Sequence, residues 1–152
     1  MKILDFLHPE TVLTDLTARD KMGALEELAA PVARAAGVPS EEIVRVLMER
    51  ERLGSTGIGE GIAIPHGKLK NLERMVIAFG LSRQGVAFDA IDGLPARIFF
   101  LIITPEASTG LHLKLLARIS RLLREAHIRE GLSRVESPAH VLALIAEEDE
   151  EF

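Results

Sequence analysis

The chain has 152 residues, of which 47% are hydrophobic and 27% charged, a balance typical of one globular domain and not of a disordered chain. It contains no cysteine, which excludes disulfides, thiol catalysis and thiolate metal sites, and its net charge of −5 argues against nucleic-acid binding. No apolar run approaches the ~20 residues of a membrane helix and residues 1–10 lack the apolar core of a signal peptide, so we expect a cytoplasmic protein without direct membrane insertion.

The first part of the chain has the apolar spacing of two helices. Residues 17–36 carry apolar side chains at helical intervals, with Thr17 as the candidate cap and Pro31 as an expected kink or break. Residues 39–54 predict a second helix, which Ser40 would cap and Gly54 would close.

Strand-like segments follow, and helices return at the end. Residues 74–82 and 96–104 are short runs rich in β-branched or aromatic side chains, and residues 85–93 predict a further short strand. Helical periodicity reappears at 109–125 and at 137–149, the latter with Ser137 at the cap and Pro138 at the first helical position.

This order of elements predicts one α/β domain over residues 1–152, with a mixed β-sheet flanked by helices on both faces. The acidic end of the chain, from about residue 147, is expected to be a solvated tail because like charges repel and rarely pack.

The stretch GIGEGIAIPHGKL, residues 57–69, presents one histidine, His66, after three glycines. A nucleotide loop is disfavoured, because the stretch does not fit G-x-x-x-x-G-K-[ST] and a helix precedes it where a dinucleotide motif needs a strand. The five histidines are scattered without metal-ligand spacing, so we expect neither a metal nor another cofactor. Two interpretations remain: a histidine that only caps local backbone, or a histidine that the flanking glycines leave open to a phosphate or a partner.

A second histidine, His112, belongs to the apolar face of the helix that begins near Thr109. It therefore points toward the sheet from a first helical turn, where free N–H groups favour an anion. The alternative is a core histidine that hydrogen-bonds a backbone carbonyl.

The segment ERLGSTGIGEGIAIPHGKL, residues 51–69, is similar to the active-site signature of the enzyme IIA domains of the bacterial phosphoenolpyruvate-dependent phosphotransferase system, fructose/mannitol class. The signature begins at the acidic Glu51 and ends in IAIPHG without a gap. Downstream, FDAIDGLPARIFFLIITP and HLKLLARISRLL resemble later blocks of the family. The residues of the signature most resemble those of the nitrogen-type, regulatory branch.

The resemblance implies that His66 is the phosphoacceptor, modified on Nε2, that His112 is the second active-site histidine, and that Arg50 lies near the phosphate. Glu60 matches an acidic position of mannitol-type members, where the nitrogen-type often has asparagine. Ser55 and Thr56 either donate hydrogen bonds to the phosphate or cap the turn, and Arg50 taken alone is also compatible with a solvated helix charge. The glycines would clear space for an incoming phosphohistidine.

The implied function is that of a phosphocarrier, a phosphotransferase component with a phosphohistidine intermediate, which takes its phosphoryl group from a histidine phosphocarrier protein. Because no transporter domain is attached, we expect a regulatory output through target proteins. One alternative is a sugar-transport enzyme IIA that passes phosphate to an enzyme IIB. An alternative of another class is a non-catalytic protein-binding module on the same fold.

Overall fold

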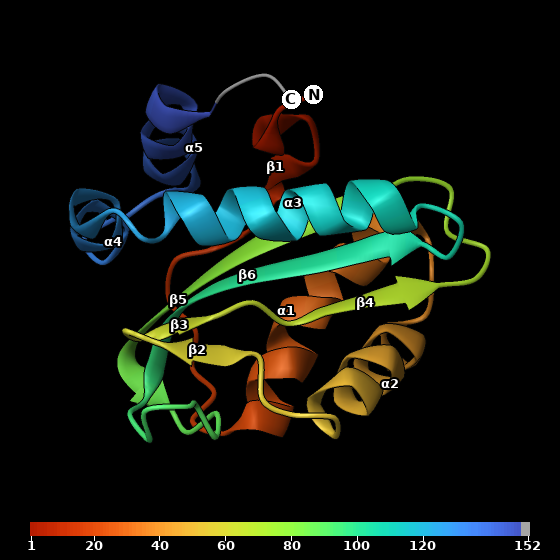
Figure 1. The fold of residues 1–152 in the computed structure, drawn as a ribbon, viewed down its shortest axis with the longest axis horizontal. Coiled ribbons are helices and arrows are strands. Elements are labelled where there is room, and N and C mark those ends of the chain that lie inside the picture. The colour runs from red at the N-terminus through yellow and green to blue at the C-terminus, as the bar shows by residue number, and fades with distance from the viewer. Residues whose placement is uncertain (150–152) are drawn as a thin grey trace.

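A six-stranded mixed sheet forms the middle layer of the protein (Figure 1). The computed structural model describes residues 1–149. The strands are β1 (Leu7–Leu13), β2 (Gly57–Gly59), β3 (Ile62–Ala63), β4 (His66–Leu69), β5 (Val76–Val86) and β6 (Ala96–Pro105). They run in the order β1-β5-β6-β3-β2, and β4 also pairs with β6. The central β5–β6 pair is antiparallel, whereas β1 pairs parallel with β5, and β3 and β4 pair parallel with β6.

Helices cover both faces of this sheet, as the order of elements predicted. One face carries α1 (Lys21–Ala36) and α2 (Ser40–Glu51); the other carries α3 (Thr109–Leu122), α4 (Ala126–Leu132) and α5 (Pro138–Glu148). Alternate β5 residues divide between the two cores: Ile77 and Phe79 pack on the α3–α5 side, and Val76 and Ala78 on the α1–α2 side. Because both faces are buried, β5 and β6 are nearly continuous apolar runs.

The two N-terminal helices begin at other residues than the sequence predicted. Asp20, not Thr17, caps α1, because its carboxylate accepts the Gly23 N–H at 2.8 Å. The helix continues through Pro31 to Ala36, so the predicted break does not occur. Ser40 is the first residue of α2 and not its cap, and α2 has no capping side-chain hydrogen bond.

Other elements were missing from the sequence prediction. Strands β1 to β4, a 3₁₀ turn at Ile3–Asp5 and the short helix α4 were not expected, and residues 87–93 form no strand of their own. The expected strands within 74–82 and 96–104 are confirmed as β5 and β6, and the Ser137 cap of α5 is confirmed by the hydrogen bond from the His140 N–H.

A break between β3 and β4 determines where His66 lies. Strands β3 and β4 pair with successive parts of β6, first Ala63 with Phe99 and then His66 with Ile102. Between them Ile64 leaves the ladder and donates its N–H to the Thr56 carbonyl, and Pro65 has no N–H to donate. His66 is therefore the first residue after an interruption of the sheet, held by β6 on one side.

The acidic end is not simply a solvated tail. Asp149 is 8% exposed, and its carboxylate accepts hydrogen bonds from the N–H groups of Ile3 and Leu4 at 2.9 and 3.0 Å. The expectation is therefore wrong for Asp149, because a carboxylate that satisfies backbone donors is stable when buried. The rest of the expected tail, residues 150–152, lies outside the described residues. Within residues 1–149, no helix is long and apolar enough to cross a membrane.

Candidate active site

The His66 ring has a defined tautomer. Its Nδ1 lies 2.8 Å from the carbonyl oxygen of Ile64, and a carbonyl only accepts hydrogen bonds. Nδ1 therefore carries the proton, and Nε2 keeps its lone pair. Burial lowers the pKa of His66 below its ordinary value of 6.5; the Ile64 hydrogen bond opposes this, and the Arg50 charge adds to it. The ring is thus neutral near pH 7, with an unprotonated, nucleophilic nitrogen at Nε2 that accepts a hydrogen bond from Arg50 Nε.

Arg50, in the last turn of α2, lies against that nitrogen. Its Nε is 3.3 Å from His66 Nε2, and its Nη1 donates to the Gly54 carbonyl at 3.0 Å. The guanidinium is therefore fixed at two points and presents further N–H groups beside the nucleophile. A planar donor fork of this kind suits phosphoryl oxygens. The structure places Arg50 at His66, where a solvated helix charge would have pointed away.

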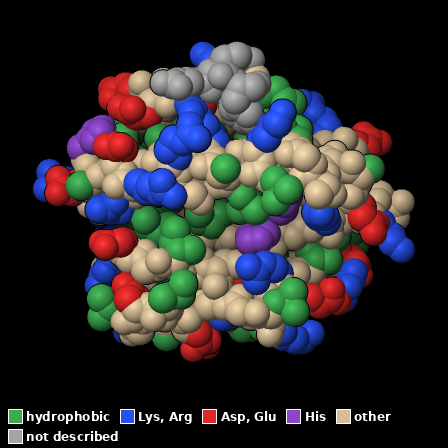
Figure 2. All heavy atoms as spheres, in the orientation of Figure 1, with side chains coloured by type: hydrophobic (Ala, Val, Ile, Leu, Met, Phe, Trp, Pro, Cys, Tyr) green, Lys and Arg blue, Asp and Glu red, His purple; other side chains and the backbone are tan. Residues whose placement is uncertain are grey.

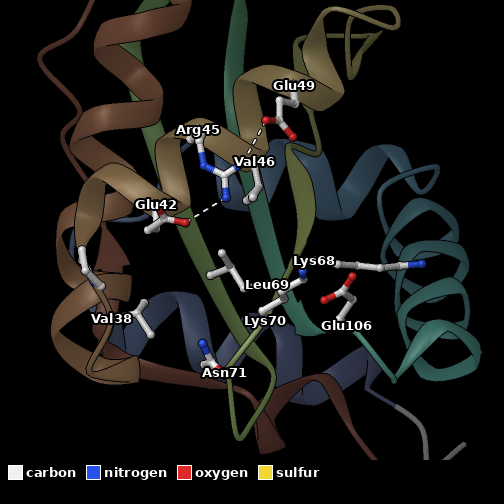
Figure 3. Close-up of a pocket in the computed structure, with 11 residues that line it drawn as sticks. Val38, Glu42, Arg45, Val46, Glu49, Lys68, Leu69, Lys70, Asn71 and Glu106 are labelled. Carbon is white, nitrogen blue, oxygen red and sulfur yellow. Dashed lines mark hydrogen bonds and ion pairs between the residues drawn. The ribbon is translucent and has the colours of Figure 1, made fainter.

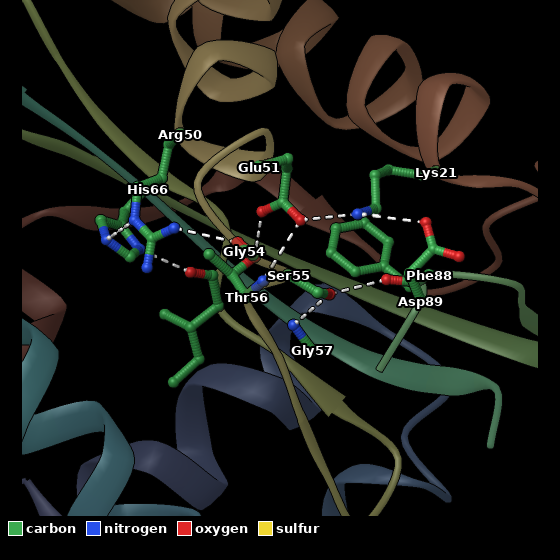
Figure 4. Close-up of polar contacts among 11 residues, drawn as sticks. Lys21, Arg50, Glu51, Gly54, Ser55, Thr56, Gly57, His66, Phe88 and Asp89 are labelled. Carbon is green, nitrogen blue, oxygen red and sulfur yellow. Dashed lines mark hydrogen bonds and ion pairs between the residues drawn. The ribbon is translucent and has the colours of Figure 1, made fainter. Parts of the chain in front are cut away.

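Behind Arg50, the buried carboxylate of Glu51 fixes the turn that follows α2 (Figure 4). It accepts hydrogen bonds from both the N–H and the hydroxyl of Thr56, and Lys21 Nζ lies 3.0 Å from its Oε1. Lys21 also lies 3.4 Å from Asp89. Because the Gly54 carbonyl that holds Arg50 belongs to this turn, Glu51 supports Arg50 indirectly. This role of Glu51 was not predicted from the sequence, although Glu51 is the first residue of the signature.

Three residues considered for phosphate binding are engaged elsewhere. The Ser55 hydroxyl donates to the Phe88 carbonyl at 2.7 Å and accepts the Gly57 N–H, and the Thr56 hydroxyl is taken by Glu51. Both therefore cap the turn. Glu60 lies in the turn between β2 and β3, where its N–H donates to Asp92. None of the three lines the hollow around His66.

Two glycines of the motif make room for the protein's own side chains. A Cβ on Gly67 would lie 3.0 Å from Val46 of α2, and a Cβ on Gly57 would lie 2.9 Å from Ala90. The expectation that the glycines clear space for an incoming group is therefore wrong at these two positions. Gly67 allows α2 to pack closely against β4, the strand that carries His66, and Gly57 allows the loop after β5 to pack closely against β2.

His112 lies beside His66, as its helical position predicted. The ring centroids are 5.4 Å apart and the rings are tilted by 57°. His112 is buried in the first turn of α3, and its Nδ1 lies 2.7 Å from the Thr104 hydroxyl of β6, so its partner is not the backbone carbonyl considered as the alternative. Burial, followed by the charges of His66 and Lys68, lowers the pKa of His112 to about 4. The ring is therefore neutral at pH 7.

The two histidines open into a hollow of about 410 Å³ between α2 and α3. Figure 2 shows histidine side chains in a furrow of the surface, with basic and apolar side chains next to them. Lys68 lines the hollow and donates to the Thr109 hydroxyl at 3.0 Å. This second cation was not predicted from the sequence, although it follows His66 by two residues. Leu53 and Leu113 form an apolar rim, 84% and 60% exposed. A neutral nucleophile in a hollow lined by two cations is suited to holding a phosphoryl group.

A larger groove of about 530 Å³ lies between α2 and β4 and adjoins this hollow (Figure 3). Three of its charged side chains are paired with one another, since Arg45 bridges Glu42 and Glu49 at 2.8 and 2.9 Å. It contains no histidine. Within residues 1–149, no three histidine or carboxylate side chains are gathered as a metal site would need. Of these two adjoining cavities, only the smaller one contains histidine side chains, which are the candidate nucleophiles.

Comparison with known proteins agrees with this geometry. Residues 5–148 match the family described as phosphoenolpyruvate-dependent sugar phosphotransferase system, EIIA 2. The chain belongs to this family. Its members are phosphotransferase components that transfer phosphoryl groups through a histidine, and the phosphocarrier role follows from membership.

Individual relatives include both nitrogen regulatory proteins and sugar-specific phosphotransferase components. The chain is 39% identical to a nitrogen regulatory protein of Bradyrhizobium diazoefficiens over 146 residues, covering 96% of this chain and 95% of the relative. It is 34% identical to a fructose-specific EIIABC component of Bacillus subtilis over 98% of this chain, which is only 24% of that longer protein. Among solved structures, the nitrogen regulatory protein IIA-Ntr of Neisseria meningitidis superposes with a TM-score of 0.88 at 33% identity, covering 93% of this chain and 97% of that one.

Proposed function

We propose that this EIIA chain accepts a phosphoryl group on Nε2 of His66 from a histidine phosphocarrier protein, and that its output is regulatory. The observation that carries the proposal is the hydrogen bond from His66 Nδ1 to the Ile64 carbonyl, which leaves Nε2 unprotonated beside Arg50. EIIA domains exchange phosphate with partner proteins, and we assign the donor role to a histidine phosphocarrier. Because the relay draws on phosphoenolpyruvate, we place the reaction in the cytoplasm.

The transfer step needs no proton movement. The Nε2 lone pair of His66 attacks the phosphorus as the donor's N–P bond breaks, and the electron pair of that bond stays on the donor nitrogen. Positive charge develops on the His66 ring, and donation from Nδ1–H to the Ile64 carbonyl stabilises it. The remaining chemistry is positioning and charge stabilisation.

Three side chains would stabilise the phosphoryl group. Arg50 is within hydrogen-bond distance of Nε2 and reaches the phosphoryl oxygens once a phosphorus is bound there. Lys68 lines the same hollow as a second cation. His112, neutral and in ring contact with His66, offers a hydrogen bond that carries no added charge.

Two outputs compete, and the relatives favour the regulatory one. The nitrogen regulatory relative of B. diazoefficiens is 39% identical and matches end to end, and the N. meningitidis structure supports the same branch. Sugar transport is the second candidate, favoured by a fructose-specific EIIA component of Haloferax volcanii that is 38% identical over 84% of this chain. The intact His66–Arg50–His112 arrangement argues against a non-catalytic binding module.

A labelling experiment tests the proposal. The full chain is incubated with labelled phosphoenolpyruvate, the general phosphotransfer enzyme and its small histidine carrier, and the label is then chased with a fructose- or mannitol-class enzyme IIB. We expect acid-labile label on His66 that depends on the carrier and remains largely on the chain in the presence of IIB. Absence of label would contradict the phosphocarrier proposal, and rapid chase onto IIB would favour the sugar-transport output.

A further inference from the structure

Thr104 interrupts an otherwise apolar face of β6. Ile98, Phe100 and Ile102 alternate toward the α3–α5 core, and Thr104 continues the same alternation at the end of the strand. Its side chain is fully buried. Valine has nearly the same shape and would fill this position without burying a hydroxyl, so the hydroxyl needs an explanation of its own.

The explanation is a hydrogen bond to His112. Within residues 1–149, the one hydrogen bond of the Thr104 hydroxyl joins its Oγ1 to His112 Nδ1 at 2.7 Å. If Nδ1 carried the proton, the proton of the buried hydroxyl would have no acceptor, which is costly. If the hydroxyl donates to Nδ1, both groups are satisfied. The second arrangement places the ring proton of His112 on Nε2.

Only a neutral imidazole has a choice of tautomer, and His112 is neutral. Burial and the neighbouring charges of His66 and Lys68 hold its pKa well below the ordinary value. Because Nδ1 faces Thr104, Nε2 is on the side of the His112 ring that contacts His66 and lines the hollow. His112 Nε2 has no hydrogen-bond partner among the described residues, so it is available to a bound group.

We propose that Thr104 is a positioning residue, whose hydroxyl fixes His112 as the Nε2–H tautomer and so presents an N–H donor to the phosphoryl group on His66. The proposal rests on the proposed function, because His112 has a role only if a phosphoryl group reaches His66. During transfer the His112 proton stays on Nε2 and is shared with a phosphoryl oxygen. The two histidines are thus set in opposite tautomers: His66 offers a lone pair at Nε2, and His112 offers a proton at Nε2.

The first test reads the tautomer directly and needs no phosphoryl transfer. Two-bond ¹H–¹⁵N correlation spectra of the full chain at neutral pH distinguish a protonated ring nitrogen from an unprotonated one, and His112→Gln assigns the signals. We expect Nε2–H in the wild type and in Thr104→Ser, which keeps the hydroxyl. In Thr104→Val we expect a mixture or a switch to Nδ1–H. A wild-type His112 with its proton on Nδ1, or an unchanged tautomer in Thr104→Val, would overturn the proposal.

The second test measures transfer. Single-turnover phosphorylation of Thr104→Val should slow about 10-fold, the effect of losing one well-placed hydrogen bond, with the apparent KM for the donor unchanged. Thr104→Ser should recover most of the rate. Thr11→Val is the matched control: Thr11 is a fully buried threonine of β1, whose hydroxyl donates to the Ile77 carbonyl at 2.8 Å, away from the site. It should lose stability yet keep the wild-type rate and the wild-type His112 tautomer.

The two tests separate the failure of this inference from that of the proposed function. A wild-type chain that shows the Nε2–H tautomer but takes no label would contradict the phosphocarrier proposal and, with it, the role of Thr104 in transfer. A wild-type chain that takes label while Thr104→Val transfers at the full rate would overturn the inference alone. Equal loss of rate in Thr11→Val and Thr104→Val would reduce Thr104 to a packing residue.

Discussion

On the α2 side of the site a cation, Arg50, contacts His66, whereas the ring that contacts His66 from α3, His112, is neutral. Arg50 contacts the nucleophile, and the buried Glu51 behind it is compensated by Lys21. Across the hollow, Thr104 and His112 form a hydrogen-bonded pair with no net charge. A nucleophilic imidazole must be neutral, while the phosphoryl group it receives is strongly anionic. The protein meets both requirements by placing the Arg50 cation beside Nε2 and keeping the second imidazole unprotonated.

Removing the His66 imidazole, which both sides of the site surround, should have the largest effect. His66→Ala should abolish labelling by phosphoenolpyruvate, because no other described histidine stands beside Arg50 with a free nitrogen. The fold should persist, since His66 is only half-buried and contributes little packing. Exposed His140 is the control, and His140→Ala should label normally. Label retained by His66→Ala would place the phosphoacceptor elsewhere.

The neutral side is tested by His112→Ala. We expect phosphoryl transfer to slow by about 10² to 10⁴-fold, the range typical of a positioned acid–base group, with little change in affinity for the donor protein. The reason is that the missing hydrogen bond acts on the phosphoryl group during transfer and not on partner docking. Single-turnover rates in both directions measure the effect. Wild-type rates would return His112 to the role of a buried core histidine.

The charged side is tested by Arg50→Ala, with Arg45→Ala as the matched control on the same helix. Arg50→Ala should lose about 10² to 10³ in rate, as removal of one donor from a preorganised anion site does, and Arg50→Lys should recover part of it. Arg45 bridges Glu42 and Glu49 on the exposed face of α2 and does not contact His66. A rate lost equally in both variants would indicate a general charge effect.

The support of Arg50 by Glu51 should appear mainly as stability. Glu51→Ala leaves the Thr56 donors and Lys21 without their buried carboxylate, and should cost about 3 kcal/mol of unfolding free energy. Glu51→Gln keeps an acceptor and should cost less. Urea unfolding measures both. An unfolding free energy unchanged in Glu51→Ala would show that the turn is held by its other contacts.

The smallest effect is a pH dependence of stability. The folded-state pKa of His112 is about 4, below its ordinary 6.5, so the unfolded chain binds the proton first as the pH falls. The stabilisation is complete above 6.5 and is lost progressively toward about 4. His112→Gln should therefore flatten the stability curve between these values. Parallel wild-type and variant curves over this interval would contradict the lowered pKa.

The sequence predicted the parts of the fold that have strong periodicity. The strands β5 and β6 and the helices α1, α2, α3 and α5 were expected because their apolar patterns are long. Strand β1 was missed because HPE interrupts its apolar residues, and its register with β5 shifts between Leu7 and Val12. Strands β2 to β4 were missed because their glycines and Pro65 are typical of loops.

For the site, the sequence predicted the residues that contact His66 but not the residues that position those contacts. His112 and Arg50 were expected there, from helical spacing and from the family signature. The sequence did not predict a role at the site for Thr104 or Lys68, nor the ion pair of Glu51 with Lys21. The relevance of these residues depends on how the strands and helices are brought together; Lys68, for example, pairs with Thr104 across β4 and β6. Ser55 and Thr56 were ambiguous in sequence, since a hydroxyl in a turn suits an anion and the backbone equally well.

The clasp between Asp149 and the N–H groups of Ile3 and Leu4 joins residues that are 145 and 146 positions apart. The two ends of the described chain therefore lie next to each other. A domain with adjacent ends can be inserted into a loop of a host protein through short connections on both sides, without separating the two sides of that loop. The same closeness makes residues 1–149 suited to circular permutation, with new ends opened in an exposed loop and the old ones bridged by a short linker.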